Sequence, residues 1–291
     1  MAVVNTNANA SIAQNALARN ERAMNTAMER LSTGQRINSA SDDAAGLAIS
    51  SRMTSQIRGL ETGIRNAHDA ISMISTADGA LIEVTNMLQR MRELALQASN
   101  GTTTSADRNY LSAEYVNLAA EIERVAQNTQ WNGKDILDGT ANGTSATVAF
   151  QVGANGGQTI SVSFGNATNG VVATVSGMLE TVASAAPNLV AGTTASAITK
   201  GTSAVTAIDT AITAVNSQRA TFGATINQLT YAIDNLSNVQ VNAEASRSRI
   251  MDADYAVETS ELARTQIIQQ AGTAMLAQAN QLPQTVLSLL Q

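Results

Sequence analysis

Few residues of this chain combine the type and the spacing that catalysis needs. His68 is the only histidine, and neither an H-E-x-x-H metal motif nor a nucleophile and base surround it. Two carboxylate pairs, Asp42/Asp43 and Asp252/Asp254, could in principle form acid–base couples. Each pair comes just before an expected helix, where negative charge stabilises the helix start. We therefore interpret both pairs as helix caps, and we predict that the protein is not an enzyme.

The glycine-rich stretch 153–157 could cradle a phosphate group. However, no Gly-Lys-Ser/Thr follows it, and no helix is expected to begin there. The runs on either side, 147–152 and 160–164, alternate apolar and polar residues, and Asn155-Gly156 between them is typical of a hairpin turn. We predict a β-hairpin here. The chain also lacks cysteine, which excludes disulfides and thiolate chemistry, so we expect no cofactor and no metal.

Composition excludes further classes of partner. The chain is 44% hydrophobic but only 3% aromatic, so it offers few platforms on which sugar rings could stack. Its net charge is -6, and no basic patch stands out, which argues against nucleic-acid binding. No apolar run is long enough to insert in a membrane, and the first residues do not resemble a secretory signal. These features taken alone predict a cytoplasmic protein.

A heptad pattern in the first third of the chain predicts one very long helix. Apolar residues recur at alternating spacings of three and four from Ile57 to Leu88, interrupted only by Asp78 and Thr85. A second apolar set takes over from Val84 to Ala98. The expected helix, from about residue 44 to 99, would be on the order of 80 Å long. A helix of this length needs partner helices along its apolar stripe.

Two further patterns supply these partners. After the polar loop 100–104, a third helix should place Leu111, Tyr115, Leu118, Ile122 and Val125 on one side. From Ser203 a second long heptad runs to Ala243, interrupted only by Arg219 and Gln240. We therefore predict a mainly α fold, a long antiparallel coiled-coil bundle with adjacent N- and C-termini and a small β-hairpin region.

The two ends of the chain share a third pattern. Each has an apolar seam at heptad spacing, no charged side chain occurs in residues 1–18, and none occurs beyond Arg264. The seam residues are Leu17, Asn20, Met24, Leu31, Ile268, Met275, Leu282, Val286 and Leu289. The polar Asn20 can fix the register of a helix pair. Uncharged outer faces suit burial among many copies, so we expect a structural subunit whose ends are poorly ordered alone and order on polymerisation.

Four blocks of the sequence resemble bacterial flagellin, namely 31–50, 88–97, 248–255 and 269–290. The resemblance covers roughly residues 1–165 and 203–291. It implies a hairpin-shaped subunit in which both ends form the inner tube of a filament. The implied segments are 1–43 (inner-tube helix), 44–140 (core rods), 141–202 (hairpin and short variable segment), 203–250 (core rod) and 251–291 (inner-tube helix).

The resemblance also implies a function and a set of partners. The subunit would assemble with itself into the flagellar filament for swimming motility, after export in unfolded form through the flagellum's own apparatus. It would therefore be secreted and extracellular, which overrides the cytoplasmic expectation. The implied partners are an export chaperone at the C-terminal helix and the filament cap and hook–filament junction proteins. The apolar C-terminal seam gives chaperone docking a physical basis, a helix in a groove.

One recognition surface follows from the same resemblance. Flagellins that activate the flagellin-sensing Toll-like receptor carry matching residues at the positions of Arg90, Leu94 and Glu114. Arg90 could donate a forked hydrogen bond, Leu94 could fill a shallow pocket and Glu114 could accept from a partner. The alternative is that Arg90 and Glu114 are a solvated rim and Leu94 packs inside the bundle.

Two other functions stay open. One is the junction protein between hook and filament, which shares the terminal patterns; the flagellin-like blocks 248–255 and 269–290 argue against it. The other is a cell-surface, polysaccharide-binding homologue of flagellin, which the low aromatic content disfavours.

Overall fold

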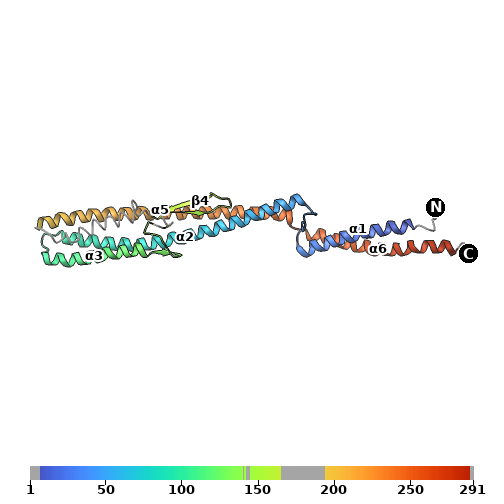
Figure 1. The fold of residues 1–291 in the computed structure, drawn as a ribbon, viewed down its shortest axis with the longest axis horizontal. Helices are drawn as coiled ribbons and strands as arrows, with labels where there is room; N and C mark the ends of the chain where they lie inside the picture. Colours follow the sequence, from blue (N-terminus) through green and yellow to red (C-terminus); the bar gives the residue numbers. More distant parts are fainter. Residues whose placement is uncertain (1–6, 140, 142–144, 165–193, 289–291) are drawn as a thin grey trace. The chain divides into compact units, whose positions relative to one another are not determined.

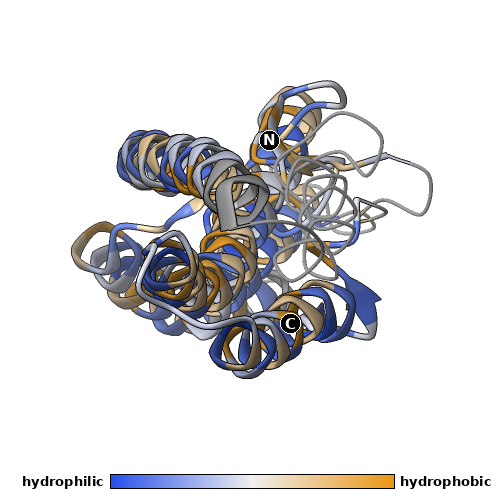
Figure 2. Ribbon diagram, turned by 90° about the vertical axis from the view of Figure 1, so that its left-hand side faces the viewer, coloured by the Kyte–Doolittle hydropathy of each residue, from blue (hydrophilic) through white to orange (hydrophobic). Residues whose placement is uncertain are grey.

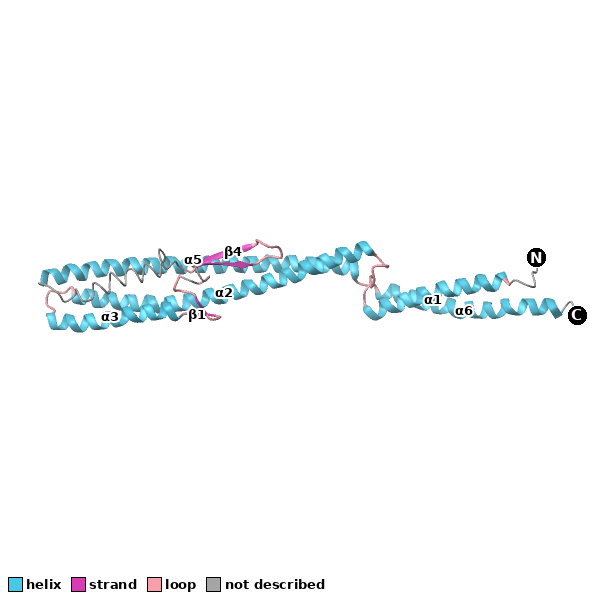
Figure 3. Cartoon of the chain, in the orientation of Figure 1, coloured by secondary structure: helices cyan, strands magenta, loops and turns pink. Residues whose placement is uncertain are grey.

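The computed structural model describes residues 7–139, 141, 145–164 and 194–288, and most of them are helical (Figure 1, Figure 3). The elements are α1 (Ala8–Thr33), α2 (Ala44–Ala98), α3 (Ser105–Asn128), β1 (Gln130–Trp131), β2 (Lys134–Asp135), β3 (Thr147–Gln151), β4 (Thr159–Ser163), α5 (Thr194–Met251) and α6 (Tyr255–Ser288). The mainly α fold with a small hairpin region is confirmed. A short helix that the sequence favours at 175–185, and the loop around residue 187, lie outside the described residues.

The chain divides into two compact units. We call residues 1–57 with 241–291 the terminal unit, and residues 58–240 the rod unit. In the described part of the chain, no helix is both long and apolar enough to cross a bilayer.

The rod unit is a bundle of antiparallel helices. Arg92 pairs with Asp209 at 2.6 Å and Asp78 with Arg219 at 2.8 Å, so α2 and α5 run in opposite directions. Arg90 pairs with Glu114 at 2.9 Å, which sets α3 antiparallel to α2. The long helix α5 begins at Thr194, earlier in the chain than the expected heptad at Ser203.

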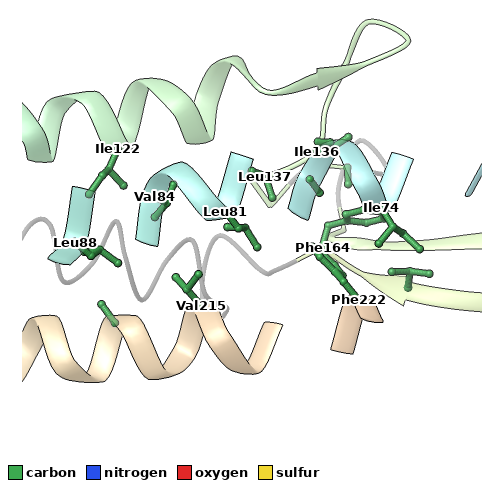
Figure 4. Close-up of a cluster of buried hydrophobic side chains, with 14 of the residues drawn as sticks. Ile74, Leu81, Val84, Leu88, Ile122, Ile136, Leu137, Phe164, Val215 and Phe222 are labelled. Carbon is green, nitrogen blue, oxygen red and sulfur yellow. The ribbon is translucent and has the colours of Figure 1, made fainter. Parts of the chain in front are cut away.

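The apolar stripes expected from the heptads form the core of the rod unit. Hydrophobic (orange) and hydrophilic (blue) residues alternate along the helix ribbons in Figure 2. Side chains of α2, α3 and α5 point toward one another, and Phe164 reaches Phe222 with 5.4 Å between the ring centroids (Figure 4). The buried members include Ile74, Leu81, Val84, Leu88, Met91, Tyr115, Ile122, Ile208, Val215, Phe222 and Leu229. Aliphatic side chains dominate this core, and Tyr115, Phe164 and Phe222 are its fully buried aromatic residues.

The β3–β4 hairpin lies against both long helices. Its strands pair from Thr147↔Ser163 to Gln151↔Thr159, so the hairpin is confirmed, but the connection is the longer loop 152–158 and not a two-residue turn at Asn155-Gly156. The side-chain amide of Asn66 on α2 donates to the Gln151 carbonyl at 2.9 Å. On the other strand, the Gln218 amide of α5 donates to the Ser163 carbonyl at 2.6 Å. Side chains of both helices thus bind the two strands of the hairpin.

Two glycines of α2 allow the hairpin loop to approach the helix closely. A Cβ atom at Gly63 would lie 2.6 Å from the Val152 carbonyl oxygen, and one at Gly59 would lie 3.0 Å from the Ala154 Cβ. The spacing of four residues places both glycines on one face of α2. Backbone therefore packs directly on backbone where a larger side chain would separate them.

The proposed caps are confirmed in part. Asp43 Oδ1 accepts from the Gly46 N–H at 2.8 Å at the start of α2, and Asp254 Oδ1 accepts from the Ala256 N–H at 2.9 Å at the start of α6. Gly34 ends α1 with φ 71°, as its position after the last apolar residue predicts. Asp42 does not cap α2. It binds the N–H of Asn38 and Ser39 in the preceding loop, and hydrogen bonds from Ser39 and Asn38 lower its pKa.

Candidate assembly surface of the terminal helices

The helices α1 and α6 of the terminal unit lie side by side in antiparallel orientation (Figure 1). The Asn7 side chain donates to the Ala279 carbonyl at 2.9 Å, while Arg30 near the other end of α1 binds Glu258 at 3.0 Å. Between these contacts, Asn20 donates to the Thr265 carbonyl at 2.7 Å and to Gln269 Oε1 at 3.2 Å. The start of α1 and the C-terminal part of α6 therefore share one end of the pair.

The structure places the predicted seam residues of α1 on the enclosed face of the helix. Asn20 is buried, and Leu17, Met24 and Leu31 are half-buried. Leu17 packs where Gly272 of α6 has no side chain, since a Cβ there would lie 3.1 Å from Leu17 Cγ. Asn20, the polar member of the seam, finds both of its partners on α6. It therefore belongs to the contact that holds the two helices in register.

The predicted seam of α6 requires a correction. Ile268 is 43% exposed and Met275 is 65% exposed, so neither lies on the face that packs against α1. The enclosed residues of α6 are instead Glu258, Leu262, Thr265, Gln269, Gly272, Leu276 and Ala279. The enclosed face has this mixed composition because Asn20 and Arg30 of α1 require polar partners and Leu17 requires a small one. Leu282 and Val286 belong to α6, but their side chains are not described, and Leu289 lies outside the described residues.

A second apolar stripe remains exposed on α6. Val257, Ile268 and Met275 lie on one side of the helix, roughly a quarter-turn from the enclosed face, and we call them the outer stripe. Val257 is 60% exposed. Neighbouring Ile267, and Ile12 and Met28 on α1, add further large apolar side chains to the exposed surface of the pair. Such a surface is typical of a binding site because apolar area gains free energy when it leaves water.

The expectation that the ends order on polymerisation stays a prediction, while in the structure α1 and α6 pair with each other within one chain. The physical reason is that the two helices bury a seam together and join it with polar contacts. The Glu258 side chain is only 11% exposed beside Arg30, and Asn20 binds two groups of α6. The pair is thus a formed structural element with an unused apolar face.

The second predicted surface lies in the rod unit on α2 and α3. Arg90 donates to Glu114 and to Glu93, each at 2.9 Å, and about half of the Arg90 and Glu114 side chains is exposed. The hydrogen bond to Glu114, followed by that to Glu93, raises the pKa of Arg90 above its ordinary value. Leu94 is only 2% exposed and belongs to the bundle core, as in the alternative interpretation. A partner could contact Leu94 only if the helices separated.

His68 is exposed on α2, and among the described residues no three His, Asp or Glu side chains gather into a possible metal site. Extended helix pairs with exposed apolar stripes are typical of structural subunits that pack against other helices.

Comparison with known proteins agrees with this class. The family model of the bacterial flagellin N-terminal helical region matches residues 4–142, and that of the C-terminal helical region matches residues 205–290. A flagellin of Halalkalibacterium halodurans is 47% identical over 265 residues, which are 91% of each chain. Flagellin A of Vibrio cholerae is 36% identical over 379 residues, covering 99% of each chain. The chain belongs to the bacterial flagellin family.

Family membership establishes the broad role. The chain is a structural protein of the flagellar filament and not an enzyme. The alignment with the Vibrio cholerae protein is longer than the 291 residues of this chain, so that relative carries residues that this chain lacks. A solved Vibrio parahaemolyticus protein, assigned to the flagellar hook-associated proteins, has a TM-score of 0.55 and 18% identity, covering 72% of this chain and all of that one. At this identity the likeness concerns the fold alone.

Proposed function

We propose that the terminal helices join neighbouring copies of this subunit and form the inner tube of an extracellular filament. In this proposal segments 1–43 and 251–291 line the tube, 44–140 and 203–250 are the rods of the surrounding shell, and 141–202 is a short variable region. The observation that carries the proposal is the outer stripe of α6. Burying each large apolar side chain contributes about 1.5–3 kcal/mol, and the stripe has no partner within the described chain.

The low charge of the same helices supports this proposal. No charged side chain occurs between Arg264 and the end of the chain, so copies can pack on every side of α6 beyond Arg264 without burying an unpaired charge. Asn20 binds two groups of α6, and Arg30 Nη1 binds Glu258, while Arg30 Nε is buried without a hydrogen-bond partner. Along α6 beyond Arg264, polymerisation therefore has to bury only neutral polar and apolar surface.

Deletion of residues 265–291 tests the proposal. We expect the truncated chain to keep the helical rods, measured by circular dichroism, and to add nothing to filament seeds in electron micrographs. The full-length chain is the control. Normal filament growth from the truncated chain would contradict the inner-tube role of α6.

Export and assembly partners follow from the same surface. We propose that an export chaperone covers the apolar side of α6 before secretion, and that the filament cap and hook–filament junction proteins contact the terminal helices. Export would take place in unfolded form through the flagellar secretion apparatus. The exposed Ile267, Ile268 and Met275 give a reason for such a chaperone because they would otherwise promote premature association.

We also propose that the monomer is recognised by the flagellin-sensing Toll-like receptor through Arg90 and Glu114. Both side chains are accessible, whereas the burial of Leu94 removes it from the contact surface. Arg90→Ala and Glu114→Ala monomers should each activate receptor reporter cells less than wild type does, with the exposed Arg65→Ala of α2 as a matched control. Wild-type signals from both variants would exclude this surface.

The two alternative functions, a hook–filament junction protein and a cell-surface polysaccharide-binding homologue, make different predictions. A junction protein would end or bridge a filament without extending it, and a sugar-binding homologue would bind polysaccharide as a monomer. The relatives with 47% and 36% identity are named flagellins, which supports the extending subunit. Seeded growth of long filaments from this chain alone would distinguish the three.

A further inference from the structure

A two-residue turn joins β1 to β2, directly after α3. Trp131 pairs with Lys134 across it, and Asn132 and Gly133 occupy its two central positions with φ 50° and 75°. Positive φ at both central residues is the mark of a type I′ turn. Asn132 is exposed and makes no hydrogen bond within the described chain, and the space around Gly133 is open. The amide side chain is therefore free to move.

We propose that Asn132 is a site of spontaneous deamidation through a cyclic imide. Hydroxide removes the proton of the Gly133 N–H, and the nitrogen attacks Cγ of Asn132. A C–N bond forms, the side-chain amide bond breaks, and ammonia leaves. Water then opens the five-membered ring at either carbonyl. Opening at one carbonyl gives aspartate, and opening at the other gives isoaspartate, in which the backbone runs through the side-chain carbon.

The conformation of the turn favours closure of this ring. A five-membered imide holds the ψ angle of the asparagine at about -120°. This is also the ψ angle of the first central residue in a type II′ turn. Asn132 already has the positive φ of that position. Only the central peptide has to flip, because type I′ and type II′ turns both fit a two-residue hairpin. The pairing of β1 with β2 can persist while the ring forms.

The other described Asn-Gly pairs are held more firmly. Asn100 Oδ1 accepts from the Thr102 N–H at 3.3 Å, and the Asn100 carbonyl accepts from the buried Arg108 at 3.1 Å. At the other pair, the Asn155 carbonyl accepts from Gln151 at 2.6 Å. Rotation of either peptide toward the ring geometry breaks these bonds. Among the three described pairs, the geometry therefore selects Asn132.

Formation of isoaspartate would change the structure beside the turn. Isoaspartate adds one carbon atom to the main chain, and a two-residue hairpin turn cannot take up this extra length without distortion. The next residues are anchored, since the Ile136 N–H donates to the Thr129 carbonyl at 3.0 Å and Ile136 and Leu137 are buried in the bundle. The added backbone atom and the new negative charge would loosen this anchor. This inference does not depend on the proposed function.

Peptide mapping of the intact chain tests the proposal. Trypsin releases residues 125–134 as one peptide, which contains Trp131, the only tryptophan, and is therefore followed by its absorbance. After incubation of folded protein in mildly alkaline buffer, this peptide should appear in two modified forms. The imide is lighter by the mass of ammonia. The aspartate and isoaspartate forms carry a hydroxyl group in place of the amide NH2 and are slightly heavier than the original peptide. Conversion at Asn132 should be several-fold faster than at Asn100 or Asn155, and Asn132→Gln should abolish the change.

The denatured chain is the internal control, because the pairs at Asn100, Asn132 and Asn155 are then equally free. There the three sites should react at similar rates. Faster conversion at Asn100 or Asn155 than at Asn132 in the folded chain would overturn the proposal. So would an unmodified folded Asn132 after a time in which the denatured chain has reacted.

Discussion

At the scale of single residues, the long helices α2 and α5 each have one charged residue in an otherwise mainly apolar seam. Asp78 and Arg219 are the charged interruptions of the two long heptads, and they bind each other at 2.8 Å with each side chain about one-third exposed. An isolated charge in an apolar seam would be costly, but a pair at the edge of the bundle keeps part of its hydration. Each interruption is therefore compensated by the other.

Single and double substitutions of this pair should give unequal effects. Arg219→Leu leaves Asp78 without its partner and should lower the free energy of unfolding by about 1–2 kcal/mol, while Asp78→Leu with Arg219→Leu should return close to wild type. Urea denaturation of all four proteins measures the coupling. Additive losses in the double variant would mean that the two side chains act independently.

At the scale of elements, contact between the hairpin loop and α2 depends on the absence of side chains. Gly63 has the Val152 carbonyl where a Cβ would lie, whereas nothing is within 4 Å of the corresponding position at Gly79 on the same helix. The same substitution therefore has opposite expected effects at two positions of one helix.

Gly63→Ala should destabilise the chain by about 1–3 kcal/mol because the loop must move away from α2. Gly79→Ala is the matched control and should stabilise by about 0.5–1 kcal/mol through the helix propensity of alanine. Thermal unfolding followed by circular dichroism compares the two variants. Equal shifts in the same direction would show that loop contact does not explain the glycine at 63.

The start of α3 should respond to acid. Thr104 Oγ1 and the Asp107 carboxylate form a capping box, and hydrogen bonding from Thr104, mainly from its side chain, lowers the pKa of Asp107. A lowered folded pKa gives stability that is present above the unfolded value of about 3.9 and is lost as pH falls through the folded pKa. Asp107→Asn should therefore melt below wild type at neutral pH and approach it under strong acid. A difference in melting temperature that is the same at every pH would show that the Asp107 carboxylate does not stabilise the start of α3.

Sequence periodicity predicted the helices better than it predicted their partners. The stripes of α2, α3 and α5 follow from apolar spacing because each of these faces packs mainly on apolar residues. On α6 the same reasoning selected Ile268 and Met275 and passed over Thr265 and Gln269, whose role depends on Asn20 of α1. The pairing of Asp78 with Arg219 depends on the register between helices far apart in the chain, which periodicity does not contain. The Asn-Gly signal at 155–156 predicted the hairpin but not its longer loop, and the tight turn at 132–133 was not predicted.

At the scale of the whole molecule, the flagellin subunit joins α1 to α6 through polar contacts and leaves an apolar face of α6 exposed. The enclosed face of α6 holds the contacts to Asn20 and Arg30, and the outer stripe beside it has no partner within the described chain. One face of α6 thus binds its own chain, and we propose that the other face binds neighbouring subunits. Polymerisation should then depend on the outer stripe without requiring the folded subunit to change.

The most direct test replaces two residues of the outer stripe in the full-length chain. Seeded polymerisation of wild type, Ile268→Gln/Met275→Gln and the control Gln266→Ser/Gln270→Ser is followed by electron microscopy, with circular dichroism of each monomer. We expect long filaments from wild type and from the control, and few or none from the stripe variant, whose helix content should equal that of wild type. Filaments of normal length and number from the stripe variant would contradict the assignment of this face to assembly.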